Sequence, residues 1–120
     1  MKGIDNFREL LGIDLVEAKD GYARMTMKVT EALVNALGFT HGGAIFSFAD
    51  CAFAEAANSG DKTAVAVQVS INFVRPTVVG DLLTAEAIRV SEGKTFGLYS
   101  ITVRKDNKTV AVFSGLAYKQ

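Results

Sequence analysis

The chain has 120 residues, 49% of them apolar, and its thirteen acidic and thirteen basic residues leave a net charge of zero. That length fits one domain with a sizeable core. The balanced charge, without a basic patch or a Lys/Arg run, argues against a protein that binds nucleic acid or a membrane surface. Because Cys51 is the single cysteine and His41 the single histidine, an intrachain disulfide is impossible and a structural zinc site is not expected.

We therefore expect a single domain over residues 1–120 with a cytoplasmic location. A lone cysteine is typical of a reducing compartment. The first residues lack the apolar stretch of a secretory signal peptide, and no nucleotide-binding glycine motif occurs in the chain.

The first third of the chain predicts four elements: a short helix over 4–11, strands over 13–19 and 22–29, and a loop over 30–41. Asp5 or Asn6 caps the helix, and Gly12 ends it. Asp20-Gly21 is a strong hairpin signal between the two strands. The second strand alternates cleanly, with one apolar face made by Ala23, Met25, Met27 and Val29.

The stretch from Thr40 to Asn58 predicts one long helix that is apolar on nearly every side. A helix of this kind is buried, and this one is too short and too rich in alanine to span a bilayer. It begins with His41-Gly42-Gly43 and carries one carboxylate, Asp50, near its middle. Burying an ionised carboxylate costs several kcal/mol unless it is paired, so Asp50 needs a reason to be there.

Four strands are expected after the helix, over 65–73, 82–90, 95–104 and 109–118, with turns between them. In the first of them, alternation places five apolar side chains on one face: Val65, Val67, Val69, Ile71 and Phe73. Hairpin-connected strands form an antiparallel sheet. One sheet can hide a long helix only by curling around it, which predicts an α+β fold with the helix on one face of a curved sheet.

Chemistry-bearing groups gather at the start and on one side of the helix. Glycines at 42 and 43 leave free backbone N–H groups at the positive end of the helix dipole, which is a good oxyanion hole for acyl chemistry. Asp50 shares its stripe with apolar residues, which raises its pKa and suits a base or nucleophile. Asn35 and His41 add neutral polar groups in the preceding loop.

The spacing of these groups has a consequence. Gly42 and Asp50 are eight residues apart, which is roughly 12 Å of helix rise. A carbonyl bound at Gly42 is out of reach of Asp50 in the same chain. If both act on one atom, Asp50 comes from a second copy, and the sequence predicts a symmetric dimer with two composite sites.

Each of these residues also has a purely structural reading. A lone buried Asp often caps a loop or pairs with arginine, and His41 at a helix start is commonly a packing or capping residue. Asn35 and the two glycines could serve turn geometry alone. Cys51 points about 100° away from Asp50 and is expected to be an inert buried thiol. Glu55 lies on the opposite side of the helix, so it makes no carboxylate pair with Asp50.

The run from Asn35 through His41-Gly42-Gly43 to Asp50 closely resembles the hotdog-fold acyl-CoA thioesterases of the phenylacetic acid degradation type. The resemblance continues through Ile71-Asn-Phe-Val-Arg75-Pro76, Gly80-Asp81 and Gly93-Lys94-Thr95, and so covers almost the whole chain. It implies a hotdog fold, dimers that pair into tetramers, and a reaction that needs no metal or other cofactor, since coenzyme A is part of the substrate.

The resemblance also implies roles for single residues. The Gly42 N–H would polarise the thioester carbonyl, and Asp50 of the partner subunit would attack it or activate water. Asn35 would orient that water or the carboxylate, and His41 would help place the thioester. Some relatives hold the water with a serine on the strand after the helix, and here that position is Ala66.

The coenzyme A arm would lie near two surface regions: Arg75-Pro76, and the turn made by Gly93, Lys94 and Thr95. Arg75 and Lys94 are chemically suited to its phosphates, although both are equally compatible with ordinary solvated charges.

These observations favour hydrolysis of an aromatic (phenylacetyl-like) or medium-chain acyl-CoA. Phe39, Phe46 and Phe53 are compatible with such a chain, but phenylalanine is also ordinary core material. Two alternatives remain. One is a hotdog hydratase or dehydratase with His41 as base and Asp50 as acid. The other is a module that binds acyl-CoA without catalysis.

Overall fold

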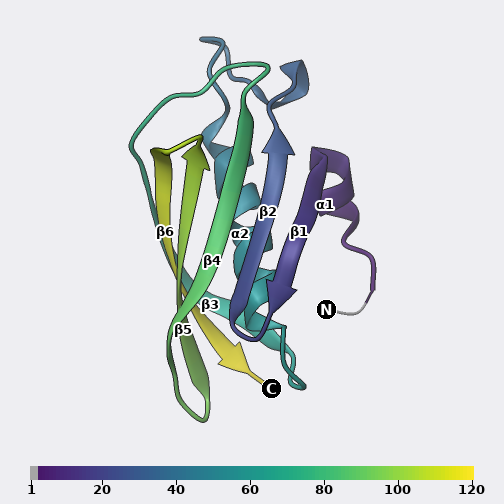
Figure 1. The fold of residues 1–120 in the computed structure, drawn as a ribbon, viewed down its shortest axis with the longest axis vertical. Coiled ribbons are helices and arrows are strands. Elements are labelled where there is room, and N and C mark those ends of the chain that lie inside the picture. The colour runs from purple at the N-terminus through teal and green to yellow at the C-terminus, as the bar shows by residue number, and fades with distance from the viewer. Residues whose placement is uncertain (1–2) are drawn as a thin grey trace.

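The computed structural model describes residues 3–120 as one long helix held by a six-stranded sheet (Figure 1). The short N-terminal helix lies beside the first strand. Together the elements are α1 (Asn6–Leu11), β1 (Ile13–Lys19), β2 (Tyr22–Lys28), the 3-10 turn η1 (Glu31–Leu33), α2 (Gly42–Ala57), β3 (Ala64–Phe73), β4 (Leu82–Glu92), β5 (Phe96–Lys105) and β6 (Lys108–Lys119).

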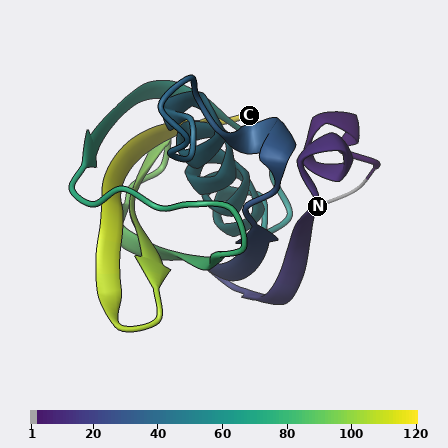
Figure 2. The ribbon, with the colours of Figure 1, turned by 90° about the horizontal axis from the view of Figure 1, so that it is seen from above.

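All neighbouring strands pair antiparallel, in the order β1-β2-β4-β5-β6-β3. Figure 2, which looks from above, shows the sheet curling around α2 while α1 stands apart beside β1. This is the α+β hotdog architecture expected from the sequence. One detail differs from a simple run of hairpins: β3 pairs with β6, and the segment 74–81 carries the chain across to β4.

The core lies between the concave face of the sheet and the inner side of α2. The largest fully buried side chains come from both layers and include Phe48 and Phe53 of α2, Met25 and Met27 of β2, and Phe113 of β6. The alternation of β2 predicted this face correctly. No helix within residues 3–120 is long and apolar enough to cross a membrane.

The helix ends follow local capping chemistry. The Asp5 carboxylate accepts a hydrogen bond from the backbone N–H of Arg8 at 3.0 Å, which satisfies one of the free donors at the start of α1. Gly12 ends α1 in the left-handed region with φ of 71°, where glycine has no steric penalty. Asn58 caps the end of α2, and its side-chain amide also joins α2 to the start of β3.

The prediction that alternate residues of β3 form one apolar face is wrong in the first half of the strand. A register shift between Ala66 and Gln68 marks a bulge, so two residues of β3 oppose one of β6. Val65 pairs with Tyr118 and therefore lies on the convex face, whereas Ala66 pairs with the buried Ala117 and lies on the helix side. Strict alternation could not predict this, because a bulge inserts a residue without any pattern signal.

Candidate active site

The N-terminus of α2 is built around His41. Its ring Nδ1 accepts a hydrogen bond from the Gly43 N–H at 2.8 Å, so His41 is the cap of the helix. A side chain at position 43 would bring a Cβ to 3.0 Å from that nitrogen, which explains the second glycine. Because Nδ1 accepts, the ring is neutral and carries its proton on Nε2. His41 can therefore donate a hydrogen bond to a ligand, but Nδ1 is not free to act as a base.

The first glycine leaves a donor open. Within residues 3–120 the Gly42 N–H has no acceptor, and it stands at the positive end of the helix dipole. Gly42 lies against the ring of Phe73, where an added Cβ would sit 3.4 Å from the nearest ring carbon. Both residues line an open cavity of about 350 Å³ whose wall also includes Ile45, Arg75 and Pro76. A small polar group entering this cavity can reach the free N–H.

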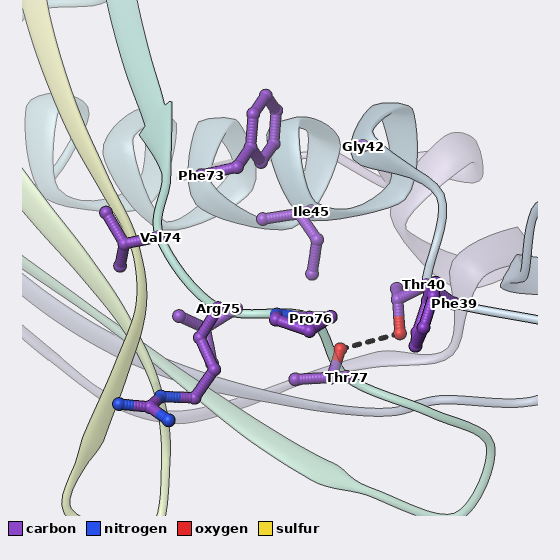
Figure 3. Close-up of a pocket in the computed structure, with 10 residues that line it drawn as sticks. Phe39, Thr40, Gly42, Ile45, Phe73, Val74, Arg75, Pro76 and Thr77 are labelled. Atoms are coloured by element: carbon purple, nitrogen blue, oxygen red, sulfur yellow. Dashed lines mark hydrogen bonds between the residues drawn. The ribbon is translucent and has the colours of Figure 1, made fainter.

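Two threonines fix the rim of this cavity. The hydroxyls of Thr40 and Thr77 lie 2.6 Å apart, and the Thr40 N–H donates to the Thr77 carbonyl at 2.9 Å. The bond joins the loop before α2 to the segment after β3, as Figure 3 shows. In the same view the Arg75 side chain extends away from Gly42. These hydrogen bonds therefore tie the two segments of the rim together, whereas the guanidinium stands at its outer side.

Asp50 lies two turns further along α2 on the side that the sheet leaves open. It is half-buried, and its carboxylate makes no hydrogen bond or ion pair in the part of the chain that the structure describes. Burial raises the pKa of Asp50, and the negative charge of Asp5 raises it further. This is the direction predicted from its apolar stripe. A desolvated, unpaired carboxylate is a stronger base than one in water.

Asn35 organises the loop that precedes the helix. Its side-chain oxygen accepts from the backbone N–H groups of Leu37 at 2.9 Å and Phe39 at 3.1 Å. The turn role considered from the sequence is therefore present. The Nδ2 group makes no hydrogen bond among the described residues, so Asn35 keeps a free NH2 group near the start of α2.

The predicted site residues fall into three groups. Asn35, His41, Gly42 and Arg75 lie at the N-terminal end of α2, and Asp50 lies in a separate small cavity further along the helix. Gly93, Lys94 and Thr95 form the β4–β5 turn at the opposite end of the sheet (Figure 1) and line another open cavity of about 400 Å³. One chain thus brings together neither Gly42 with Asp50 nor Arg75 with the turn.

The remaining polar and sulfur groups of α2 have structural roles. Burial raises the pKa of Cys51 to about 12, so the thiol stays protonated and inert, as expected. Glu55 is buried on the side of α2 that contacts α1, which we call the closed side, and its carboxylate lies 3.3 Å from the Arg8 guanidinium. Residues 3–120 contain no group of three His, Cys, Asp or Glu side chains that could hold a metal ion.

Two contributors were not predicted from the sequence. Phe73 forms the wall against Gly42, although the sequence showed only that it belonged to an apolar strand face. Gly115 lies under the ring of Phe53 beside the Asp50 cavity. A signal for the second was present, because a glycine inside an alternating strand often marks a close approach of another group.

Comparison with known proteins gives concordant matches in sequence and structure. Residues 37–112 match the family model described as "Thioesterase superfamily". The chain is 43% identical to acyl-coenzyme A thioesterase PaaI of Escherichia coli over 116 residues, 96% of this chain and 83% of that protein. It is 32% identical to human acyl-coenzyme A thioesterase 13 over 80% of this chain and 71% of that protein.

The solved structures agree. The E. coli PaaI structure superposes with a TM-score of 0.94, covering 97% of this chain and 85% of that one. The protein smu.793 from Streptococcus mutans, solved with acetyl CoA bound, is 26% identical with a TM-score of 0.88 and covers 100% and 93% of the two chains. The sequence match and the fold match to PaaI therefore each cover nearly the whole chain.

Proposed function

The chain belongs to the thioesterase superfamily and is a thioester hydrolase, and we propose that its substrate is an acyl-CoA, which it cleaves to the free acid and coenzyme A. The observation that carries this proposal is the unpaired, desolvated Asp50 on the open side of α2. Its chemistry suits attack on a thioester or activation of water. The names of the PaaI and human relatives support the same substrate class.

In the proposed reaction the free Gly42 N–H stabilises the developing charge on the thioester oxygen. A backbone donor at a helix N-terminus needs no reorganisation for this role. His41 offers its Nε2–H nearby, and Asn35 offers its Nδ2 to the water or to the carboxylate. We propose no metal or other cofactor, since a carboxylate and backbone donors are sufficient for this hydrolysis.

The two halves of the site meet, we propose, across a homodimer. The two sheet edges differ in a way that supports this. The β1 edge is bulged between Leu15 and Glu17, carries charged side chains and has α1 beside it. The β3 edge is ten residues long, mostly exposed and apolar, with Val67 51% and Phe73 54% exposed. An exposed apolar edge strand of this kind can pair with a strand of another chain, and β3 of a second subunit would pair there.

Pairing of β3 edges would also place the open side of one α2 next to that of its copy. Asp50 of one chain would then face Gly42 of the other, as the helix rise of roughly 12 Å requires. We further propose that such dimers pair into tetramers.

The cytoplasmic location stays our expectation, since the single buried thiol suits a reducing compartment.

The phosphates of coenzyme A have two candidate partners. Neither Arg75 nor Lys94 forms an ion pair within the described residues, so both remain available for a phosphate. Because Arg75 and Lys94 lie at opposite ends of the folded subunit, we propose that one coenzyme A arm contacts Arg75 of one subunit and Lys94 of another. Gly93 and Thr95 shape the turn that presents Lys94.

The acyl group, we propose, is aromatic and phenylacetyl-like or of medium length. The experiment that tests the function measures thiol release from a panel of acyl-CoAs by the wild type and by Asp50→Asn. We expect thiol release from at least one member of the panel. Asp50→Asn should lower this release by about a thousandfold, while its melting temperature at pH 7 is no lower than that of the wild type. Asp14→Asn on the exposed side of β1 is the matched control and should keep full activity.

Other outcomes would replace this proposal. Near-wild-type release by Asp50→Asn would remove Asp50 from the chemistry. Hydration of an enoyl-CoA without thiol release would favour the hydratase alternative, although the capped Nδ1 of His41 argues against it. Tight acyl-CoA binding with neither reaction would favour a binding module.

A further inference from the structure

A small cavity opens directly beside Asp50. It lies between α2 and the edge formed by β3 and β6, and its walls are Phe53 together with alanines such as Ala54, Ala66 and Ala117. The volume is about 90 Å³. That equals about three water volumes and is smaller than the cavity of roughly 150 Å³ that accepts benzene in another protein. It has room for only a few carbon atoms next to the Asp50 carboxylate.

The position of one aromatic ring sets the size of this cavity. Phe53 is 2% exposed, and its ring packs against Tyr99 at 5.6 Å and Phe113 at 5.8 Å between ring centres. Beneath it lies Gly115 of β6, which pairs with Tyr99 across the sheet. A Cβ at position 115 would come within 2.7 Å of Phe53 Cε2 and 2.8 Å of Cζ. The ring therefore occupies space that any other residue at 115 would fill.

A side chain at 115 would force the ring of Phe53 to move. Tyr99 and Phe113 flank it, and β6 lies below it, so these sides are closed. Protein interiors have few voids, and a displaced side chain moves toward the nearest one. Here that void is the cavity beside Asp50, of which Phe53 is already a wall. Filling the space at 115 would consequently shrink the cavity.

Building on the proposed function, we infer that Gly115 determines acyl-group selectivity: by letting the Phe53 ring rest on β6, it keeps open a subsite beside Asp50 for the acyl carbons next to the thioester carbonyl. The Phe53 ring then limits the size of the part of the acyl group next to the thioester carbonyl, whereas the rest of a longer acyl group extends past the open β3 side. Gly115 acts through Phe53 and touches no reacting atom, so it is a positioning residue.

The test compares Gly115→Ala with the wild type on acetyl-, butyryl-, hexanoyl- and phenylacetyl-CoA. We expect kcat/KM for phenylacetyl-CoA relative to acetyl-CoA to fall by about tenfold, because a loss of space near one methylene changes discrimination by that order. Phe53→Leu, which enlarges the cavity, should move the same ratio in the opposite direction. If Gly115→Ala folds poorly, Phe53→Leu carries the test.

The matched control is Gly97→Ala. Gly97 is also a buried strand glycine on the helix side, and its added Cβ would meet an aromatic ring at 3.0 Å. That ring belongs to Tyr99, which lines a different cavity at the C-terminal end of α2. Tyr99 also packs against Phe53, but Gly97→Ala does not fill the space beneath the Phe53 ring. This variant should therefore alter stability while changing the acyl-size ratio less than Gly115→Ala does.

The outcomes separate this inference from the proposed function. Equal losses for all acyl-CoAs in Gly115→Ala, or equal ratio changes in Gly115→Ala and Gly97→Ala, would overturn the selectivity role while leaving Asp50-dependent hydrolysis intact. Absence of thiol release from every acyl-CoA by the wild type would instead overturn the function on which the inference rests.

Discussion

Two carboxylates five residues apart on α2 have opposite surroundings. Glu55 faces the closed side, where its side chain is 8% exposed and lies 3.3 Å from the Arg8 guanidinium. Asp50 faces the open side, is half-buried, and has no charged or hydrogen-bonding partner within residues 3–120. Both are acids on an apolar helix. The difference lies in what the fold supplies to each.

That difference separates a stabilising acid from a reactive one. A buried charge with a partner is neutralised, whereas a buried charge without one keeps a raised pKa and a poorly solvated lone pair. The pKa of Asp50 is raised, mainly by burial, whereas α1 delivers Arg8 to Glu55. Glu55 on the closed side of α2 thus stabilises the fold, whereas Asp50 on the open side remains available to react.

After Asp50→Asn, the largest effect should come from removing the oxyanion donor on the open side. Gly42→Pro deletes the free N–H, and proline is well tolerated at the first position of a helix. His41, the preceding residue, already has φ of −62° and ψ of 135°, which a following proline permits. We expect kcat to fall by about a hundredfold or more, with α2 intact by circular dichroism. Unchanged kcat would exclude Gly42 as the donor.

On the closed side the prediction concerns stability. Glu55→Ala leaves Arg8 without its partner, so we expect the free energy of unfolding to fall by about 2 kcal/mol. The kcat of the folded enzyme should stay within about twofold of wild type, since Glu55 is outside the site. Urea unfolding measures the first quantity and thiol release the second. Glu17→Ala, which removes two exposed ion pairs, with Lys19 and with Arg24, is the control and should cost less than about 0.5 kcal/mol.

An intermediate effect is expected at Asn35, where two roles can be separated. Asn35→Asp keeps the side-chain oxygen that accepts from Leu37 and Phe39 but loses the Nδ2 donor. If the donor serves the reaction, kcat falls by about tenfold while the loop stays ordered. Asn35→Ala loses both roles and should also lower the melting temperature. Full activity in Asn35→Asp would limit Asn35 to turn geometry.

The smallest effect is the pH dependence of stability on the open side. Because the pKa of Asp50 is raised in the folded chain above its ordinary value of 3.8, the folded state binds its proton more tightly than the unfolded state. The ionised form is therefore a cost above that raised pKa. Asp50→Asn should raise the melting temperature at pH 7, by at most about 2 °C, and the gain should vanish below pH 3.8. A lower melting temperature at pH 7 would show a stabilising partner for Asp50.

Much of the fold was predictable because its signals are local. Alternation in β2, the Asp-Gly hairpin and the Asp5 cap each depend on neighbouring residues, and each is confirmed. The β3 bulge depends on pairing with β6, which is distant in sequence, and this is why simple alternation assigns Val65 to the wrong face. The pairing of β3 with β6 is likewise a contact between segments that are distant in sequence.

The site was predictable to the extent that it lies on one helix. The rise of an ideal helix is enough to separate Gly42 from Asp50. The same kind of argument applies to Arg75 and Lys94, which lie before and after β4, a strand of 11 residues and so about 35 Å long. The contact between Phe53 and Gly115 was out of reach, because it depends on how a helix side chain meets a strand distant in sequence.

The central claim is that each active site takes Gly42 from one chain and Asp50 from another. Gly42→Pro and Asp50→Asn, each inactive alone, would be unfolded together and refolded as a mixture. A mixed dimer with sites of this kind has one intact site, so random pairing predicts recovery of about a quarter of the wild-type thiol-release rate. No recovery, in a mixture shown to contain mixed dimers, would contradict the account.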